Sequence, residues 1–112
     1  MPRVIEMRTY KTKPGQRDEF VRLFRSKSVP AHEKIGMKII GPFLAIEDPE
    51  TVFWMRIFPD IASREALKSQ FYDSDLWKHD LEITLFPLLD KYDCLLIEDI
   101  ENTFGLPGFQ VR

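Results

Sequence analysis

The feature that most constrains this 112-residue sequence is a strand pattern that is apolar on both faces. In the segment Phe53-Trp54-Met55-Arg56-Ile57-Phe58, the only polar residue is Arg56. Successive side chains of a strand point to opposite faces, so a sheet with one face in water should alternate between apolar and polar residues. The segment Cys94-Leu95-Leu96-Ile97 is likewise apolar on both faces. We therefore expect both faces of the sheet to be covered.

The hydrophobic period alternates along the chain between that of a strand and that of a helix. Strands are expected over residues 4–10, 37–46, 51–58 and 92–100, and helical segments over 16–35, 61–71 and 77–89. Pro30 predicts a kink or break near Ser28, and Asp60 is placed to cap the second helix. The Gly41-Pro42 pair predicts a bulge, a bend or an edge strand. The order β-α-β-β-α-α-β, with right-handed crossovers, predicts an α+β fold, a ferredoxin-like split βαβ antiparallel sheet with helices on one face.

Helices on one face leave the other face of this sheet uncovered, and the chain has no element left to cover it. A second copy of the sheet is the simplest cover, so we expect a homodimer formed sheet against sheet. Residues 1–112 are expected to form one domain, with a core over 3–100 and a C-terminal arm over 101–112. The arm carries Phe104 and Phe109, which we expect to lie against the partner.

Composition excludes several classes of function. With 16 Lys+Arg against 18 Asp+Glu, the net charge of −2 argues against a general nucleic-acid binder. No apolar run approaches the ~20 residues of a membrane span. Charged residues near Met1 stand where a signal peptide would be apolar, which favours a cytoplasmic location.

Standard cofactor motifs are missing from this sequence, so no cofactor is expected. There is no phosphate-binding loop and no dinucleotide fingerprint. A single cysteine, Cys94, rules out an intrachain disulfide and any cysteine-cluster metal site. It lies in an apolar strand and is predicted to belong to the core. His32 and His79 are too far apart in sequence for a structural zinc site, and His79 is expected on the surface.

Several short motifs, taken in order, resemble the NIPSNAP family. Ile5-Glu6-Met7-Arg8-Thr9-Tyr10 followed by Lys13-Pro14-Gly15 is similar to that family's opening strand and turn. The segment from Val29 to Lys38 is similar to the end of its first helix and the start of its second strand. Arg56-Ile57-Phe58-Pro59 with Ser63-Arg64-Glu65-Ala66 resembles its third strand and following helix, and Trp77 fits the position of a later tryptophan.

The resemblance spans residues 4–100 and implies a dimeric α+β barrel, in agreement with the doubly apolar strands. The chain looks like the small single-domain bacterial members of that family, whose biochemical roles are poorly defined. Related dimeric α+β barrels include cofactor-free monooxygenases, isomerases, dehalogenase-type enzymes and haem proteins. This breadth means that the fold alone assigns no activity.

Barrels of this kind resemble one another in keeping a cavity between helices and sheet, and here its expected lining is aromatic. The candidate ligand-binding residues are Arg8, Phe24, Trp54, Phe58, Phe71 and Trp77. Apolar walls with a few polar groups are typical of a small-molecule site. The alternative is that these rings are simply core, as aromatic residues at helical spacing usually are.

His32, Tyr10 and Arg56 are the candidate catalytic residues. His32 follows the Pro30 break, beside the apolar stripe of its helix, where an imidazole can act as acid or base. The alternative is a histidine at a helix end that is favoured by the helix dipole or faces solvent. Arg8 and Tyr10 share a strand face with Glu6, where they would bind a ligand or form an ion pair and a tyrosine hydrogen bond at the dimer interface.

Arg56, the only polar residue of an apolar strand, needs a carboxylate or an anionic ligand if it is buried. Glu98 on the last strand is the candidate protein partner. The sequence leaves open which face of the strand Arg56 takes.

Three functions fit these residues. The first is binding of a small lipophilic or aromatic molecule in the cavity of each protomer. The second is a cofactor-independent monooxygenase or isomerase that uses His32 as acid or base. The third is a non-catalytic dimerisation or interaction module. A haem-binding version would have His32 as its only plausible axial ligand.

Overall fold

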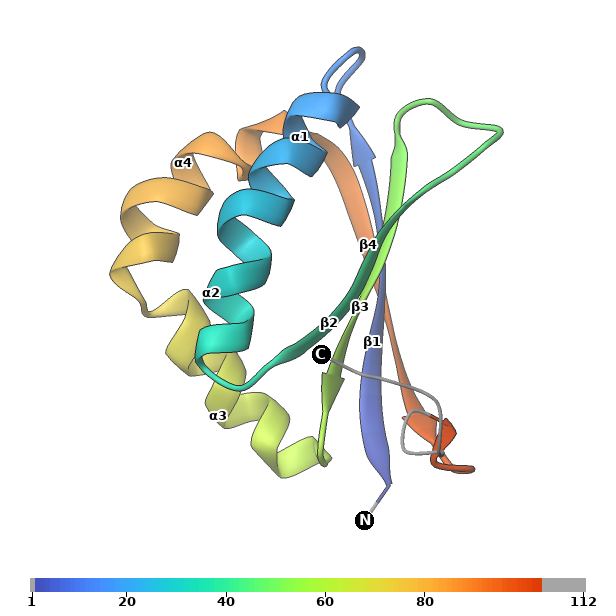
Figure 1. The fold of residues 1–112 in the computed structure, drawn as a ribbon, viewed down its shortest axis with the longest axis vertical. Helices are drawn as coiled ribbons and strands as arrows, with labels where there is room; N and C mark the ends of the chain where they lie inside the picture. The colour runs from blue at the N-terminus through green and yellow to red at the C-terminus, as the bar shows by residue number, and fades with distance from the viewer. Residues whose placement is uncertain (1, 104–112) are drawn as a thin grey trace.

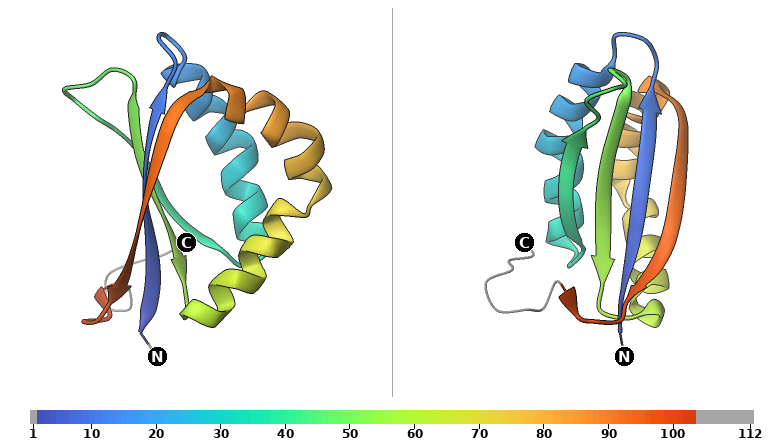
Figure 2. Two further views of the ribbon diagram at one scale, coloured as in Figure 1. Left: turned by 180° about the vertical axis from the view of Figure 1, so that it is seen from behind. Right: turned by 90° about the vertical axis from the view of Figure 1, so that its right-hand side faces the viewer.

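A computed structural model describes residues 2–103 of the chain. Its centre is a four-stranded antiparallel sheet with the strand order β2-β3-β1-β4, seen face-on in the right-hand view of Figure 2. The strands are β1 (Arg3–Thr12), β2 (Lys38–Leu44), β3 (Thr51–Phe58) and β4 (Leu89–Asp99). The first and third strands are therefore central, and the second and last are edges.

The helical segments all lie on one face of this sheet (Figure 1). They are α1 (Arg17–Leu23), η1 (Phe24–Ser28), α2 (Val29–Lys34), α3 (Ile61–Tyr72), η2 (Trp77–Leu81), α4 (Glu82–Thr84) and η3 (Phe86–Leu88). This arrangement confirms the predicted α+β fold of the ferredoxin-like type. No helix of the described part, residues 2–103, is both long enough and apolar enough to cross a membrane.

The first helical segment runs without a break from Arg17 to Lys34, and it contains an irregular turn near Ser28, where the sequence predicted a kink or a break. Residues Phe24–Ser28 form a π-helical turn, in which the backbone N–H of Val29 donates to the carbonyl of Phe24, five residues earlier. Pro30 has no N–H to donate and its ring crowds the preceding turn, and the wider π-helical turn lies directly before it. The helix then continues to Lys34, and Gly36 follows with a positive φ of 95°.

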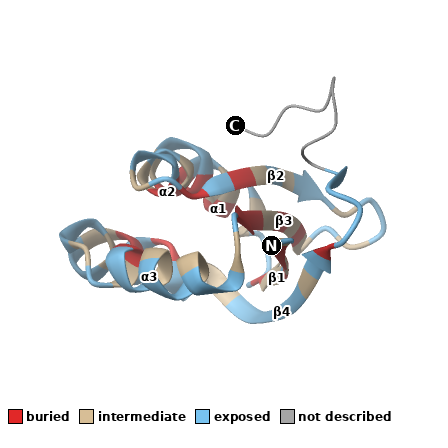
Figure 3. Cartoon of the chain, turned by 90° about the horizontal axis from the view of Figure 1, so that it is seen from below, coloured by how far each residue is buried: buried red, intermediate tan, exposed pale blue. Residues whose placement is uncertain are grey.

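The hydrophobic core fills the space between the helices and the sheet, as the burial colours of Figure 3 indicate. The inward face of β3 carries Val52, Trp54 and Phe58, all nearly or fully buried. The side chain of Asp60 accepts a hydrogen bond from the backbone N–H of Ser63, which confirms the predicted cap of α3.

No helix covers the opposite face of the sheet in residues 2–103 (Figures 1 and 2). Met7 of β1 lies directly between Met55 of β3 and Leu95 of β4, so these three side chains share that face. Leu95 is 61% exposed.

The prediction that Cys94 belongs to the core is wrong. This residue is exposed, because β4 is an edge strand whose side chains are mostly open to solvent. The prediction that Phe104 and Phe109 contact a partner concerns residues outside the described part of the chain.

Of the features that Gly41-Pro42 could indicate, the structure has two: β2 is an edge strand, and its pairing with β3 shifts register between Ile40 and Phe43. Gly41 has a φ of 112°, a conformation that residues with a side chain rarely adopt. A Cβ atom at Gly41 would lie 3.1 Å from the Cβ of Trp54 and 3.2 Å from the carbonyl oxygen of Phe53. Glycine therefore allows the edge strand to pass close behind Trp54.

We expect Gly41→Ala to lower the free energy of unfolding by about 2–3 kcal/mol, because it adds a steric clash to the unfavourable φ. Gly36→Ala is the matched control. Gly36 also has a positive φ, but nothing lies within 4 Å of the added Cβ, so its loss should be only about 1 kcal/mol. Urea denaturation of both variants gives the comparison. Equal losses would show that the close approach to Trp54 is unimportant.

Candidate functional site

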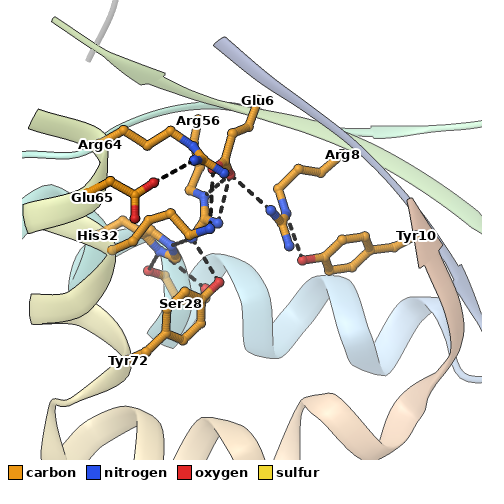
Figure 4. A network of polar contacts seen from close by, with 10 residues as sticks. Glu6, Arg8, Tyr10, Ser28, His32, Arg56, Arg64, Glu65 and Tyr72 are labelled. Atoms are coloured by element: carbon orange, nitrogen blue, oxygen red, sulfur yellow. Dashed lines mark hydrogen bonds and ion pairs between the residues drawn. The ribbon is translucent and has the colours of Figure 1, made fainter. Parts of the chain in front are cut away.

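One fully buried carboxylate, Glu6, gathers three arginines between the helices and the sheet (Figure 4). Its Oε1 atom accepts from Arg8 Nη1 at 2.9 Å and from Arg56 Nε at 2.7 Å. Its Oε2 atom accepts from Arg64 Nε at 2.7 Å, and Lys68 Nζ lies 3.9 Å from the same oxygen. We call Glu6, Arg8, Arg56 and Arg64 the arginine–glutamate cluster.

Strand register explains how this cluster forms. Glu6 and Arg56 are directly opposite each other on β1 and β3, and Arg8 follows Glu6 on the same face of β1. Arg64 reaches the cluster from α3, which crosses that face. The cluster therefore ties two central strands to one helix.

The charge balance keeps Glu6 ionised. Burial alone would raise the pKa of Glu6, but the charge of Arg56 and hydrogen bonds from Arg56 and Arg64 outweigh burial and lower it to about 2. A buried carboxylate is tolerable only when it is paired and hydrogen-bonded in this way.

His32 is buried beside the cluster as a neutral imidazole. Its Nδ1–H donates to the carbonyl of Ser28 at 2.7 Å, and its Nε2 lies 3.3 Å from Arg56 Nη1, which can only donate. This pairing fixes the tautomer with the proton on Nδ1. Burial, and then the charge of Arg56, lower the pKa of His32 to about 3, so it does not carry a proton near neutral pH. The ring also stacks on Phe71 with centroids 3.9 Å apart.

Two tyrosines approach the arginines from different elements (Figure 4). Tyr10 of β1 accepts a hydrogen bond from Arg8 Nε at 3.0 Å, and Tyr72 of α3 accepts one from Arg56 Nη1 at 3.1 Å. Burial raises the pKa of Tyr10 to about 12, so its phenol keeps its proton. Trp54 lies beside both guanidinium groups. The Cζ atoms of Arg8 and Arg56 are 5.4 and 5.5 Å from the centroid of its ring.

A cavity of about 350 Å³ opens beside these polar groups, in the size range of small-molecule sites. We call it the central cavity. Its lining combines charged and polar residues with aromatic and aliphatic ones: Arg8, Tyr10, Phe20, Phe24, Ser28, His32, Trp54, Arg56, Phe71, Tyr72, Trp77, Glu82, Leu85, Phe86, Leu89 and Tyr92.

Most of the residues singled out from the sequence meet at this cavity. All three candidate catalytic residues line it, and so do five of the six candidate ligand-binding residues: Arg8, Phe24, Trp54, Phe71 and Trp77. The sixth, Phe58, is fully buried in the core and is not part of the lining.

Two interpretations of the charged residues need correction. The partner of Arg56 is Glu6 and not Glu98, which is exposed on β4. The ion pair of Arg8 with Glu6 and the hydrogen bond to Tyr10 exist, but they face the helices of their own chain, so they are not on the open sheet face where a sheet-to-sheet interface would form.

His32 does lie in the last turn of α2, as one alternative held, but it does not face solvent, since only 2% of its surface is exposed. His79 is exposed, as expected.

Sequence reasoning missed Tyr72 and Arg64, and it gave Glu6 no role beyond sharing a face with Arg8. The strand alternation of Glu6, Arg8 and Tyr10 was the available signal for the cluster. Nothing local in the sequence marks Tyr72, which ends α3 next to a turn. Within residues 2–103, no three His, Cys, Asp or Glu side chains come together to hold a metal ion.

Comparison with known families agrees with this architecture. The NIPSNAP family profile matches residues 5–94. The chain belongs to the NIPSNAP family. A comparison with curated proteins found no match.

Solved structures of other NIPSNAP proteins show the same fold. An uncharacterized NIPSNAP domain protein from Burkholderia xenovorans superposes with a TM-score of 0.76 at 17% identity, over 84% of this chain and 91% of that chain. A NIPSNAP family protein from Agrobacterium tumefaciens gives a TM-score of 0.77 at 18% identity, over 87% of this chain and 85% of that chain. These structural similarities support the fold and do not assign an activity to this chain.

We expect Glu6→Gln to lower the free energy of unfolding near pH 7 by about 3–5 kcal/mol, because three arginines lose a buried counter-charge. The pKa of Glu6 is about 2 in the folded protein against 4.5 ordinarily. Below pH 4.5 the unfolded chain binds a proton at this position that the folded chain does not bind until about pH 2. The stability advantage of the wild type should therefore be complete above pH 4.5 and shrink as the pH falls towards 2.

Chemical denaturation over this pH range measures the difference between the two proteins. Glu65→Gln is the matched control, since Glu65 pairs with Arg64 but is exposed. A gap between wild type and Glu6→Gln that stays constant from pH 4.5 to 2 would contradict the ionised state of Glu6.

Proposed function

We propose that this NIPSNAP protein binds a small lipophilic or aromatic molecule in the central cavity. The observation that carries the proposal is a cavity of about 350 Å³ whose aromatic walls meet a buried polar cluster. Protein interiors are normally close-packed, with few voids larger than a water molecule. A space of this size in a small domain is therefore more typical of a ligand site than of a core.

The apolar and polar parts of the cavity wall would have different roles in binding such a ligand. Phe20, Phe24 and Trp77 offer apolar surface that favours the burial of a ligand body. Arg8 and Tyr10, held by their hydrogen bonds, offer polar atoms in fixed positions that orient the ligand. Pre-formed polar groups lose little conformational entropy on binding.

We also propose that the protein works as a homodimer, sheet against sheet. Met7, Met55 and Leu95 give the uncovered sheet face a continuous apolar centre, and Phe43 of β2 is 50% exposed. An exposed apolar face of this kind is typical of an interaction surface. A second copy would bury that face and leave each central cavity on the outer, helical side of its own sheet.

The alternative of a cofactor-independent oxygenase or isomerase stays a prediction. It would use His32 as acid or base, with Tyr10 and Arg56 handling developing charge. Because the Nε2 lone pair of His32 already accepts from Arg56, this imidazole is better placed to hold the arginine than to take a proton from a substrate. The dimerisation module, the other alternative, would have no need of the cavity.

We expect the neutral fluorophore N-phenyl-1-naphthylamine to bind the purified protein saturably, with enhanced emission. Leu89→Trp should weaken this binding at least about tenfold, because a bulky ring on the lining fills the space. Leu76→Trp is the matched control, since Leu76 is exposed and does not line the cavity. Circular dichroism of each variant checks that it is folded. Unsaturable emission, or equal binding by wild type and Leu89→Trp, would contradict the proposal.

We expect sedimentation velocity to give a dimer for the wild type and a monomer for Leu95→Glu, because a charge on the open sheet face cannot be buried against a second sheet. The same change on the helical side, Leu76→Glu, should leave the dimer intact. A wild-type protein that sediments as a monomer at micromolar concentration would rule out the sheet-to-sheet dimer.

A further inference from the structure

Most of the hydrogen-bond acceptors in and directly behind the polar wall of the central cavity are already occupied. Both oxygens of Glu6 accept from arginines, and Nε2 of His32 accepts from Arg56. The phenol oxygens of Tyr10 and Tyr72 each accept from an arginine as well. A ligand that offers mainly N–H or O–H donors would find few free acceptors here.

In contrast, several hydrogen-bond donors of the same wall have no acceptor among the described residues. The hydrogen bonds to Tyr10 and Tyr72 use the oxygen as acceptor, so each phenol keeps an O–H to donate. Neither O–H has an acceptor within residues 2–103, and Nη2 of Arg8 has none in that part of the chain either. Nε1 of Trp54 is buried there without a partner too. Donors without acceptors on nearly buried side chains such as Arg8 and Trp54 are unfavourable, so the wall favours a ligand rich in acceptors.

The charge of the wall points the same way. Arg8 and Arg56 line the cavity, and the carboxylate they share, Glu6, is also paired with Arg64. The cluster therefore carries more positive than negative charge. Within residues 2–103 the lining contains one carboxylate, Glu82, which is exposed on α4, where water screens its charge.

We propose that the ligand of the central cavity is an organic anion, a carboxylate on an aromatic or lipophilic body. The carboxylate would accept from Nη2 of Arg8 and from the hydroxyls of Tyr10 and Tyr72, while the body lies against the aromatic wall. Figure 4 shows the two phenols reaching the arginines from β1 and from α3. The inference rests on the proposed function, because it names the chemical class of the molecule bound at the same site.

A matched pair of probes tests the inference. Naphthalene-2-carboxylate and naphthalene-2-carboxamide share one aromatic body, and only the first carries a charge and lacks donors. We expect the wild type to bind the carboxylate at least about tenfold more tightly, since charge-assisted hydrogen bonds are the stronger ones. Isothermal titration calorimetry at pH 7 measures both affinities directly.

Variants of the wall should remove this preference. Arg8→Gln is expected to bring the two affinities within about twofold of each other, while Arg25→Gln, an exposed arginine outside the lining, keeps the wild-type ratio.

Arg8 also stabilises Glu6, so Arg8→Gln will lower the stability of the fold. Tyr10→Phe and Tyr72→Phe therefore provide a second set of variants. Each substitution retains the aromatic ring, leaves the arginine charges in place and removes one O–H donor. Each should weaken carboxylate binding about three- to tenfold and weaken carboxamide binding less, because the hydrogen bond to a charged acceptor is the stronger one.

The outcomes separate the two proposals. Equal affinities for both probes in the wild type, or a preference for the carboxamide, would overturn the anion inference and leave the cavity as a ligand site. A carboxylate preference that survives in Arg8→Gln and in both tyrosine variants would also overturn it, because the anion would then lie elsewhere. Binding of neither probe, together with no binding of N-phenyl-1-naphthylamine, would overturn the proposed function as well.

Discussion

The ion pairs of Glu6 are the interaction on which the rest of the structure depends. A carboxylate with no exposed surface holds arginines from β1, β3 and α3, so it fixes two central strands and one helix relative to each other. A buried pair of this kind is a weak source of net stability, because desolvation opposes the Coulomb attraction. The pairs also disfavour other arrangements of these elements, since a different packing would leave a charge unpaired in the interior.

The same pairs determine how the central cavity is built. Arg56 is held by Glu6 on one side and shared between His32 and Tyr72 on the other. Arg8 is held in the same way between Glu6 and Tyr10. Two guanidinium groups are thus fixed beside the aromatic walls without closing the space, and the polar and apolar parts of the cavity come from different elements. Apolar walls with a few fixed polar groups are common in sites that bind small molecules.

The sequence predicted the fold much better than the site. Alternation in β1 and the doubly apolar β3 identified the strands, the order of elements and the shared face of Glu6, Arg8 and Tyr10. The pairing of Glu6 with Arg56 was missed because it depends on a cross-strand register over 50 residues of sequence, which no local pattern encodes. The exposure of Cys94 was missed because an apolar strand segment looks the same in sequence at the centre of a sheet and at its edge.

The π-helical turn at Phe24–Ser28 has a consequence for helical phase. Residues four apart on an α-helix drift by about 40° around its axis at each step, so a stripe of that spacing soon rotates away from the core. Here Phe20, Phe24, Ser28 and His32 are spaced by four and are all buried. The wider turn rotates less per residue and cancels part of the drift, which returns His32 to the inner side where it meets Arg56. The π-helical turn, which holds more residues than an α-helical turn, therefore helps to determine that His32 faces the cavity.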